Sequence, residues 1–214
     1  MRTSHYPQSQ YFLDECDRLG LLVFTELPGW QHIGDGAWKD RACAMLREML
    51  LQNRNHPSII LWGVRINESV DDDEFYTRTN KIAHALDPSR ATSGVRYLEK
   101  SHLLEDVYAY NDFSHNGSNA GAKRKKDVTP DLSKALLISE CNGHMYPTKP
   151  CDDARTGRSM PCAMRGCWTP PTQMESMRAA LAGVCLIMPP TRISAPGTAS
   201  AITACWTASA IPRW

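Results

Sequence analysis

The sequence lacks any long hydrophobic run, and none of its apolar stretches approaches the roughly 20 residues that a membrane-spanning helix needs. It also lacks an excess of one charge, because 24 basic residues stand against 23 acidic ones in 214. This balance disfavours nucleic acid and anionic membranes as general partners. The single basic run, residues 123 to 126, follows a stretch rich in glycine and serine, and we interpret it as a solvated loop.

Paired cysteines are missing as well, since the eight cysteines form no Cys-x-x-Cys motif. The sequence therefore predicts no zinc site, and we interpret the cysteines of the first half as reduced structural thiols. No signal peptide is visible at the start. This slightly favours the cytoplasm, but the compartment stays open because we expect the natural N-terminus to be missing.

The most informative stretch that is present runs from residue 54 to residue 69. Its apolar part, Ser58 to Val64, lies between Asn-His-Pro and a polar segment, as a strand covered on both faces does in a parallel sheet. The pair Asn67-Glu68 follows that strand. A carboxyl group beside an amide suits a sugar, because the amide can bind a ring hydroxyl while the carboxyl faces the glycosidic oxygen.

Strands alternate with helices over most of the first 140 residues. Helical spacing of Ala42, Met45, Leu46, Met49 and Leu50 predicts an amphipathic helix from Trp38 to Asn53 that packs on the sheet. A second helix is predicted from Asp73 to Leu86, before the proline at 88. The predicted strands are 21–26, 58–64, 91–95, 106–110 and 135–140. This order predicts parallel β/α units, eight of which close a barrel.

Four segments in order resemble family two of the glycoside hydrolases, which contains β-galactosidases, β-glucuronidases and β-mannosidases. They are the Arg-Thr-Ser-His-Tyr-Pro of residues 2–7, residues 12–26, residues 54–69, and the strand 135–140 that ends in Glu140. The resemblance implies a fragment of a (β/α)8 TIM barrel, an α/β fold, with about strands two to seven in residues 1–153. It also implies a carbohydrate substrate, retention of configuration and terminal β-glycosides, most of all β-galactosides.

The resemblance further implies roles for the two glutamates that follow strands. Glu140 is the expected nucleophile and Glu68 the expected acid/base, the pair of carboxyls that retaining glycosidases use. A strand-end glutamate in a salt bridge is the alternative for either one. Asn67 is expected to bind the 2-hydroxyl, and a turn-capping asparagine is its alternative.

Other residues are expected around the sugar. The resemblance places His5 in the pocket and gives Arg2 the task of supporting a carboxylate, and Asn111 is a further substrate-binding candidate. Among three tryptophans, Trp30 in a loop is the better stacking platform. Trp62 is better explained as core, Trp38 is the third candidate, and three residues after the nucleophile could reach substrate: His144, Tyr146 and Lys149.

The sequence departs from the family pattern at two points. Phe113 stands where the family commonly has a tyrosine that hydrogen-bonds the nucleophile, so either Tyr108 or Tyr110 replaces it or the nucleophile is tuned otherwise. The loop from Glu26 to Trp30 lacks the histidine that ligates magnesium in some β-galactosidases. We therefore predict no catalytic metal and no cofactor.

Residues 154–214 differ in character, because Pro, Ala, Ser and Thr dominate and no period persists. Their composition fits a disordered tail or linker. A sharper hypothesis is a frameshift near residue 154, since residues 157–175 and 187–207 can be re-read one base out of phase as family-like sequence. The rival to an active enzyme is accordingly a truncated, catalytically dead or sugar-binding remnant, and the oligomeric state stays open.

Overall fold

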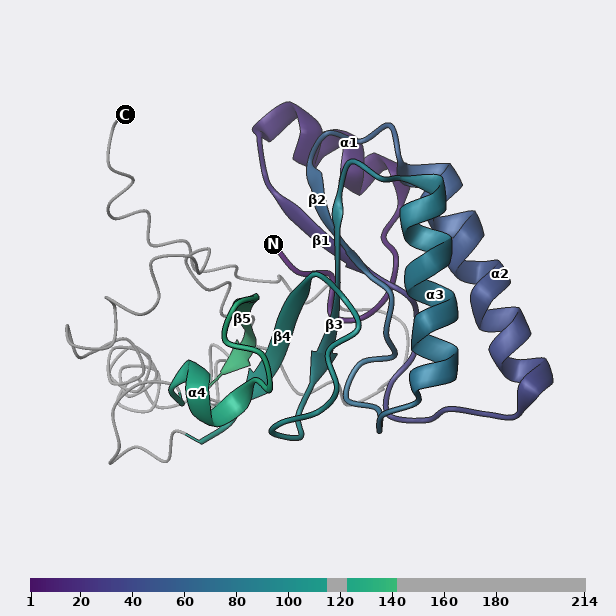
Figure 1. The fold of residues 1–214 in the computed structure, drawn as a ribbon. Coiled ribbons are helices and arrows are strands. Elements are labelled where there is room, and N and C mark those ends of the chain that lie inside the picture. The colour runs from purple at the N-terminus through teal and green to yellow at the C-terminus, as the bar shows by residue number, and fades with distance from the viewer. Residues whose placement is uncertain (115–122, 142–214) are drawn as a thin grey trace, which may run out of the picture.

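The computed structural model describes residues 1–114 and 123–141, and the statements below concern those residues. They form five parallel strands in sequential order, and a helix lies between each pair of successive strands except β3 and β4 (Figure 1). In chain order the elements are α1 (Gln10–Leu19), β1 (Val23–Glu26), α2 (Gly36–Asn53), β2 (Ile59–Gly63), α3 (Asp73–Leu86), β3 (Ala91–Arg96), β4 (Val107–Asp112), α4 (Lys125–Val128) and β5 (Ala135–Cys141).

The strand order β1-β2-β3-β4-β5 confirms the parallel β/α prediction. All five predicted strands are present, with ends that differ from the prediction by at most two residues. The first residues of the chain extend the sheet beyond β1, because Arg2 forms a parallel bridge with Phe24 and the N–H of Thr3 donates to the Phe24 carbonyl at 3.0 Å. The sheet is therefore half of a barrel with a short sixth segment beside β1.

The three long helices begin at side-chain caps that the sequence supplies. The side chains of Ser9, Asp35 and Asp72 accept the N–H groups of Phe12, Trp38 and Phe75, which would otherwise lack partners in the first turn. Helix α1 ends at Gly20, whose φ of 68° is a left-handed conformation that glycine adopts without a steric penalty.

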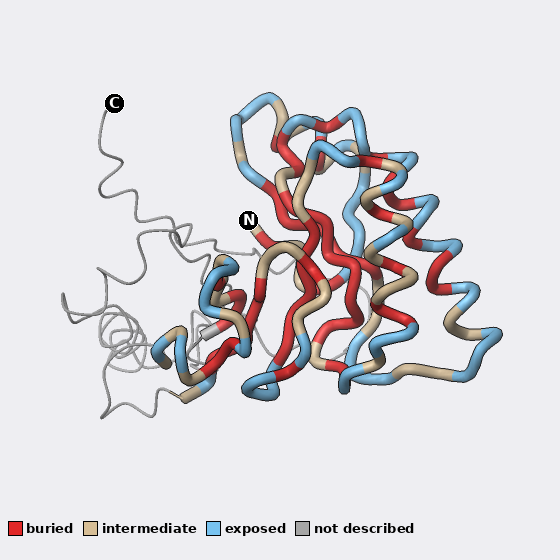
Figure 2. The backbone as a smooth tube through the Cα atoms, in the orientation of Figure 1, coloured by how far each residue is buried: buried red, intermediate tan, exposed pale blue. Residues whose placement is uncertain are grey.

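Three apolar clusters pack against the sheet, and the two larger sets of contacts described here cover the first four strands, while the third joins β4 and β5 to α4. Figure 1 shows α2 and α3 side by side along the sheet, and on that side Trp62 packs with Leu46, Leu50 and Phe75. The other face carries Phe24, Leu61, Val95 and Ala109, the interior of the half-barrel. Figure 2 shows the resulting continuous band of buried residues along the strands. Because both faces are covered, the strands have the continuous apolar character seen in the sequence.

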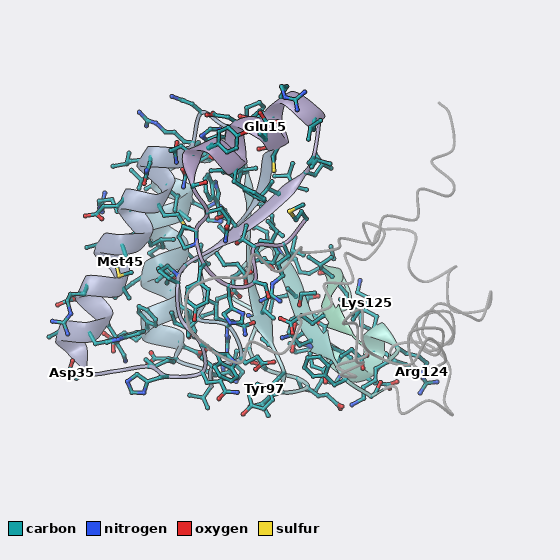
Figure 3. All side chains as sticks on the ribbon, turned by 180° about the vertical axis from the view of Figure 1, so that it is seen from behind. Glu15, Asp35, Met45, Tyr97, Arg124 and Lys125 are labelled. Carbon is teal, nitrogen blue, oxygen red and sulfur yellow. The ribbon has the colours of Figure 1, made fainter. Side chains whose placement is uncertain are left out.

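Two details of the sequence interpretation were wrong. Met45 is 46% exposed and points away from the sheet (Figure 3), whereas Cys43 is buried in its place. The stripe of helix α2 that contacts the sheet is narrower than the set of apolar residues at helical spacing, so Met45 lies outside it. The basic run is also not all loop, because Lys125 and Lys126 form the first turn of α4.

Several predictions lie outside the described residues. They are the sites at His144, Tyr146 and Lys149, and the tail 154–214 with its proposed frameshift. In the part of the chain that the structure describes, no helix combines the length and hydropathy that crossing a membrane requires.

Candidate active site

Polar side chains from four of the five strands, β1, β2, β4 and β5, meet at the carboxyl ends of the sheet. Glu26 closes β1, Asn67 and Glu68 follow β2, Asn111 lies in β4 and Glu140 in β5. Asn111 is paired with Glu140 across β4 and β5, next to a register shift between Tyr110 and Asn111. Carboxyl ends of parallel strands lie on one edge, so groups distant in sequence are brought together there.

Arg2 donates hydrogen bonds to three residues of the site. Its Nε and Nη2 donate to the two carboxylate oxygens of Glu26 at 2.8 and 2.9 Å. The same Nη2 donates to Asn67 Oδ1 at 2.8 Å, and Nη1 donates to Glu140 Oε1. Arg2 is 3% exposed, so the planar guanidinium fixes three strand ends in a buried setting.

The charges of this cluster alter one another. Burial alone would lower the pKa of Arg2, but the charges and hydrogen bonds of Glu26 and Glu140 outweigh it and raise that pKa above its usual value. Burial raises the pKa of Glu26, and the nearby charge of Glu140 adds to the rise against the opposing effect of Arg2. One cation therefore serves two carboxyl groups.

Glu68 has different neighbours. Its Oε2 accepts hydrogen bonds from Trp30 Nε1 at 2.8 Å and from Gln31 Nε2 at 3.3 Å. Its Oε1 accepts from Asn111 Nδ2 at 2.9 Å, and Ser139 Oγ donates to the oxygen of that amide at 2.9 Å. These donors are neutral, whereas Glu140 is paired with a guanidinium.

The backbone that carries Glu68 is held in a left-handed conformation, with φ of 54°. Its N–H donates to the Val95 carbonyl at 3.0 Å. On the far side of the turn, buried Arg65 donates to Asp71 at 2.6 Å and to the Ser69 carbonyl at 3.2 Å. A non-glycine residue with positive φ persists only when its surroundings fix it, and these bonds do so.

His5 and Trp30 border the same site. Their rings stack with centroids 6.3 Å apart and an interplanar angle of 21°. Trp30 is 55% exposed, which suits a stacking platform, whereas His5 is 7% exposed. Burial, aided by the charge of Arg2, lowers the pKa of His5 to about 4, so this imidazole is neutral at physiological pH.

A family model described as "Glycosyl hydrolases family 2, TIM barrel domain" matches residues 1–150. The chain belongs to this family. A β-galactosidase of Thermoanaerobacterium thermosulfurigenes is 58% identical over 154 residues, which are 72% of this chain and 22% of that protein. A β-galactosidase of Rhizobium meliloti is 40% identical over an alignment that covers all of this chain, the tail included, and 30% of the relative.

Solved structures agree with the family 2 barrel. The Bacteroides uniformis β-glucuronidase 3 is 31% identical with a TM-score of 0.54, and the match covers 68% of this chain and 20% of that one. A galacturonidase of Eisenbergiella tayi has a TM-score of 0.60 at 21% identity, over 79% of this chain and 35% of that one, and supports the fold alone. The chain spans about a fifth of the length of the first curated β-galactosidases that it matches.

The candidate site brings together most of the predicted residues. Glu68, Asn67, Asn111 and Trp30 are joined by hydrogen bonds, a backbone bridge or chain neighbourhood, and His5 stacks on Trp30. Arg2 contacts a carboxylate as predicted. The other two tryptophans are not in the site: Trp62 is fully buried and bonded to Asp87, and Trp38 packs on Phe75.

Sequence reasoning missed two members of the site, Glu26 and Gln31. Glu26 was recognised as a strand end but not as the main partner of Arg2; a charged residue closing a fully buried strand was the available signal. Neither alternative tyrosine is shown to replace the missing one, because Tyr108 and Tyr110 pack with Val128 and Leu136, and the Tyr108 hydroxyl donates to the Leu98 carbonyl. Among the residues that the structure describes, Arg2 donates to Glu140.

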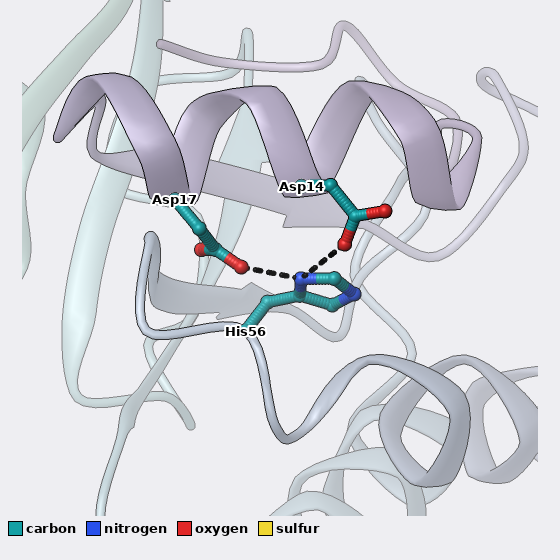
Figure 4. Close-up of side chains that lie close together, drawn as sticks. All are labelled: Asp14, Asp17 and His56. Atoms are coloured by element: carbon teal, nitrogen blue, oxygen red, sulfur yellow. Dashed lines mark hydrogen bonds and ion pairs between the residues drawn. The ribbon is translucent and has the colours of Figure 1, made fainter.

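One cluster among the described residues has the composition of a metal site, and it lies away from the candidate active site. Asp14, Asp17 and His56 meet between α1 and the loop before β2 (Figure 4). His56 Nδ1 lies 2.6 Å from Asp17 and Nε2 lies 3.1 Å from Gln10, while Asp17 also accepts the N–H of Ser58. Both ring nitrogens are engaged, so the cluster fastens α1 to the amino end of β2.

Proposed function

We propose that this site catalyses hydrolysis of terminal β-galactosides with retention of configuration. The observation that carries the proposal is the unequal surroundings of two carboxyl groups at one sheet edge. Glu140 is paired with the buried cation Arg2. Glu68 accepts hydrogen bonds from the neutral donors Trp30, Gln31 and Asn111 and has no cation as a hydrogen-bond partner among the described residues. Two carboxyls in unlike environments are the pattern of a retaining glycosidase.

The proposed reaction has two steps. In the first, a Glu140 oxygen forms a bond to the anomeric carbon while the bond to the leaving oxygen breaks, and that oxygen takes the proton of Glu68. In the second, Glu68 accepts a proton from water, the water oxygen bonds the anomeric carbon, and the ester bond to Glu140 breaks. Glu140 returns as a carboxylate and Glu68 as an acid.

Neighbouring side chains have supporting roles in this proposal. Arg2 occupies the amide oxygen of Asn67, which turns the amide NH2 towards a sugar hydroxyl. Asn111 orients the Glu68 carboxyl, and Ser139 orients Asn111 in turn. Trp30 offers an exposed ring against a sugar face, and neutral His5 is suited to a hydroxyl contact.

Relatives favour β-galactosides as the substrate class. Three curated relatives named β-galactosidase are 58%, 56% and 40% identical and a fourth is 30% identical, whereas four relatives named β-glucuronidase are 28% to 34% identical. A β-glucuronide is therefore the nearest competing substrate, followed by a β-mannoside.

A second candidate is a sugar-binding remnant without turnover. The described residues supply five strands, whereas a closed TIM barrel has eight, and an open sheet leaves strand edges and the pocket wall exposed to water. Site geometry can persist in such a sheet while exclusion of water is lost.

The test begins with the purified chain and 4-nitrophenyl β-galactoside, β-glucuronide and β-mannoside, with the first product anomer read by NMR. Retention predicts that the β-anomer appears first, and an α-anomer would disprove it. If the chain does not hydrolyse any of these substrates, residues 1–141 replace the matching segment of the Thermoanaerobacterium β-galactosidase. Activity of that chimera alone supports the remnant, whereas inactivity of both contradicts the site assignment.

Active-site variants complete the test. Glu140→Gln should abolish turnover, while Glu68→Gln should slow substrates with poor leaving groups most, because good leaving groups depart without a proton. Glu99→Gln, at an exposed glutamate paired with Lys123, is the matched control and should leave the rates unchanged. Equal slowing of good and poor leaving groups by Glu68→Gln would remove the acid role.

A further inference from the structure

Glu26 is a buried carboxyl group that the two-carboxylate reaction does not use. It ends β1 on the same face as Phe24, inside the half-barrel, and is 1% exposed. Arg2 donates to both of its oxygens, and the backbone N–H of Ser4 also donates to it. An unpaired buried carboxylate would be costly, so this bidentate pairing is what allows it to remain there.

The neighbouring strand makes room for this side chain. Gly63 is paired with Glu26 in the sheet, and a Cβ atom on Gly63 would lie 2.6 Å from Glu26 Cγ and 2.8 Å from its Cα. Any larger residue would displace Glu26 from beneath Arg2. A glycine at this position therefore fits the placement of a carboxyl group under the guanidinium.

The net charge around Arg2 changes during the proposed reaction. Before it, Arg2 lies between two carboxyl groups, Glu26 and Glu140. When Glu140 becomes the glycosyl ester, its negative charge is lost, and Arg2 would be a buried cation with no anion. Glu26 is the remaining anion within hydrogen-bond distance of Arg2 among the described residues.

We propose that Glu26 is the counter-ion that keeps Arg2 neutralised while Glu140 is esterified, and that it thereby sets the relative rates of forming and hydrolysing the intermediate. This inference rests on the proposed retaining function. Glu26 touches neither sugar nor reacting atoms in this scheme, so it is a positioning residue that acts through Arg2.

Removing the charge of Glu26 has opposite effects on the two steps. Without it, the whole charge of Arg2 stabilises the Glu140 carboxylate, which makes that carboxylate a weaker nucleophile and a better leaving group. The esterified state also gains an uncompensated buried cation. Glu26→Gln should therefore form the intermediate at least about tenfold more slowly and hydrolyse it at least about tenfold faster, the ratio that 1.4 kcal/mol produces.

The experiment measures both rates on the full chain with an activated 2-deoxy-2-fluoro-β-galactoside, which traps the ester on Glu140. Intact-mass spectrometry follows the gain of label and, after removal of the reagent, its loss. Glu26→Asp retains the charge and should keep the ratio of the two rates near that of the unaltered chain, even where a shorter side chain slows both. It also preserves the test if Glu26→Gln does not fold.

Glu105→Gln is the matched control, because Glu105 is another fully buried glutamate paired with an arginine, Arg96, outside the site. Its rates should be unchanged, with folding monitored by circular dichroism. If the unaltered chain takes no label, the proposed function fails and this inference with it. If the chain is labelled but Glu26→Gln slows both steps alike, or Glu26→Asp changes the ratio as Glu26→Gln does, Glu26 merely holds Arg2 in place and the inference is wrong.

Discussion

Replacing Asp71 by asparagine should loosen the turn that holds Glu68. The Asp71 carboxylate accepts hydrogen bonds from Arg65 Nη2 at 2.6 Å, from the His102 N–H at 3.0 Å and from the Ser101 hydroxyl. Arg65 is 1% exposed, so its charge has little access to water once Asp71 is neutral. Asparagine preserves the shape of the side chain and removes its charge.

The magnitude follows from the electrostatics of Asp71. Partial burial alone would raise its pKa, but the bonds from Ser101, His102 and Arg65 outweigh it and lower the pKa from 3.8 to about 2. At about 1.4 kcal/mol for each pKa unit, this is at most about 2.5 kcal/mol. Because the side chain is 29% exposed, solvent screening reduces the expected loss to about 1 to 2 kcal/mol.

The sign of the pH dependence is fixed by the lowered pKa. The folded state holds a proton on Asp71 less tightly than the unfolded state does, so the stabilisation is complete above about pH 4 and is lost as the pH falls through about 2. The difference between the two proteins should therefore be largest near pH 7 and shrink below pH 4.

Urea unfolding followed by circular dichroism at pH 7 and at pH 3 measures this difference. Asp73→Asn is the matched control: its pair with His102 is more than half exposed on both sides, so the change should stay below about 0.5 kcal/mol. Equal losses in the two variants, or a loss for Asp71→Asn that does not shrink with falling pH, would refute the reasoning.

Three further outcomes are expected. Gly63→Ala should lower the free energy of unfolding by about 1 to 3 kcal/mol in urea titrations, because its Cβ would clash with the Glu26 backbone, and no loss would show that β1 and β2 can shift apart. The unaltered chain should lose stability as the pH falls from about 6.5 to about 4, because the unfolded His5 imidazole takes up a proton in this range and the folded one, with its pKa lowered to about 4, does not. The His5→Gln variant should not show this loss, and a pH profile of unfolding that is the same in both proteins would contradict the reasoning. Sequencing the encoding DNA should reveal, at residues 157–175 and 187–207, the wobble bases that an out-of-phase family sequence requires, and other bases would disprove the frameshift hypothesis. The match with the Rhizobium relative, which covers the whole chain, argues against a frameshift.

The sequence by itself determined the order of the elements. Covered strands produce continuous apolar runs, and caps such as Asp72 mark helix starts, so helix Asp73–Leu86 was predicted with its observed bounds. These signals are local, because each depends on residues within a few positions along the chain. The family motifs also predicted roles for Glu68, Asn67 and Arg2, and the structure confirms that Arg2 contacts a carboxylate.

Only the tertiary structure decided which charges meet. Arg2 and Glu140 are 138 residues apart in sequence and in contact in the fold. A charged residue at the end of a buried strand marks Glu26 as unusual, but no local pattern shows that Arg2 is its partner. The exposure of Met45 was likewise set by the width of the packed sheet rather than by helical spacing. Pairings across strand ends depend on register and on space such as that beside Gly63, and these arise when the strands are packed together.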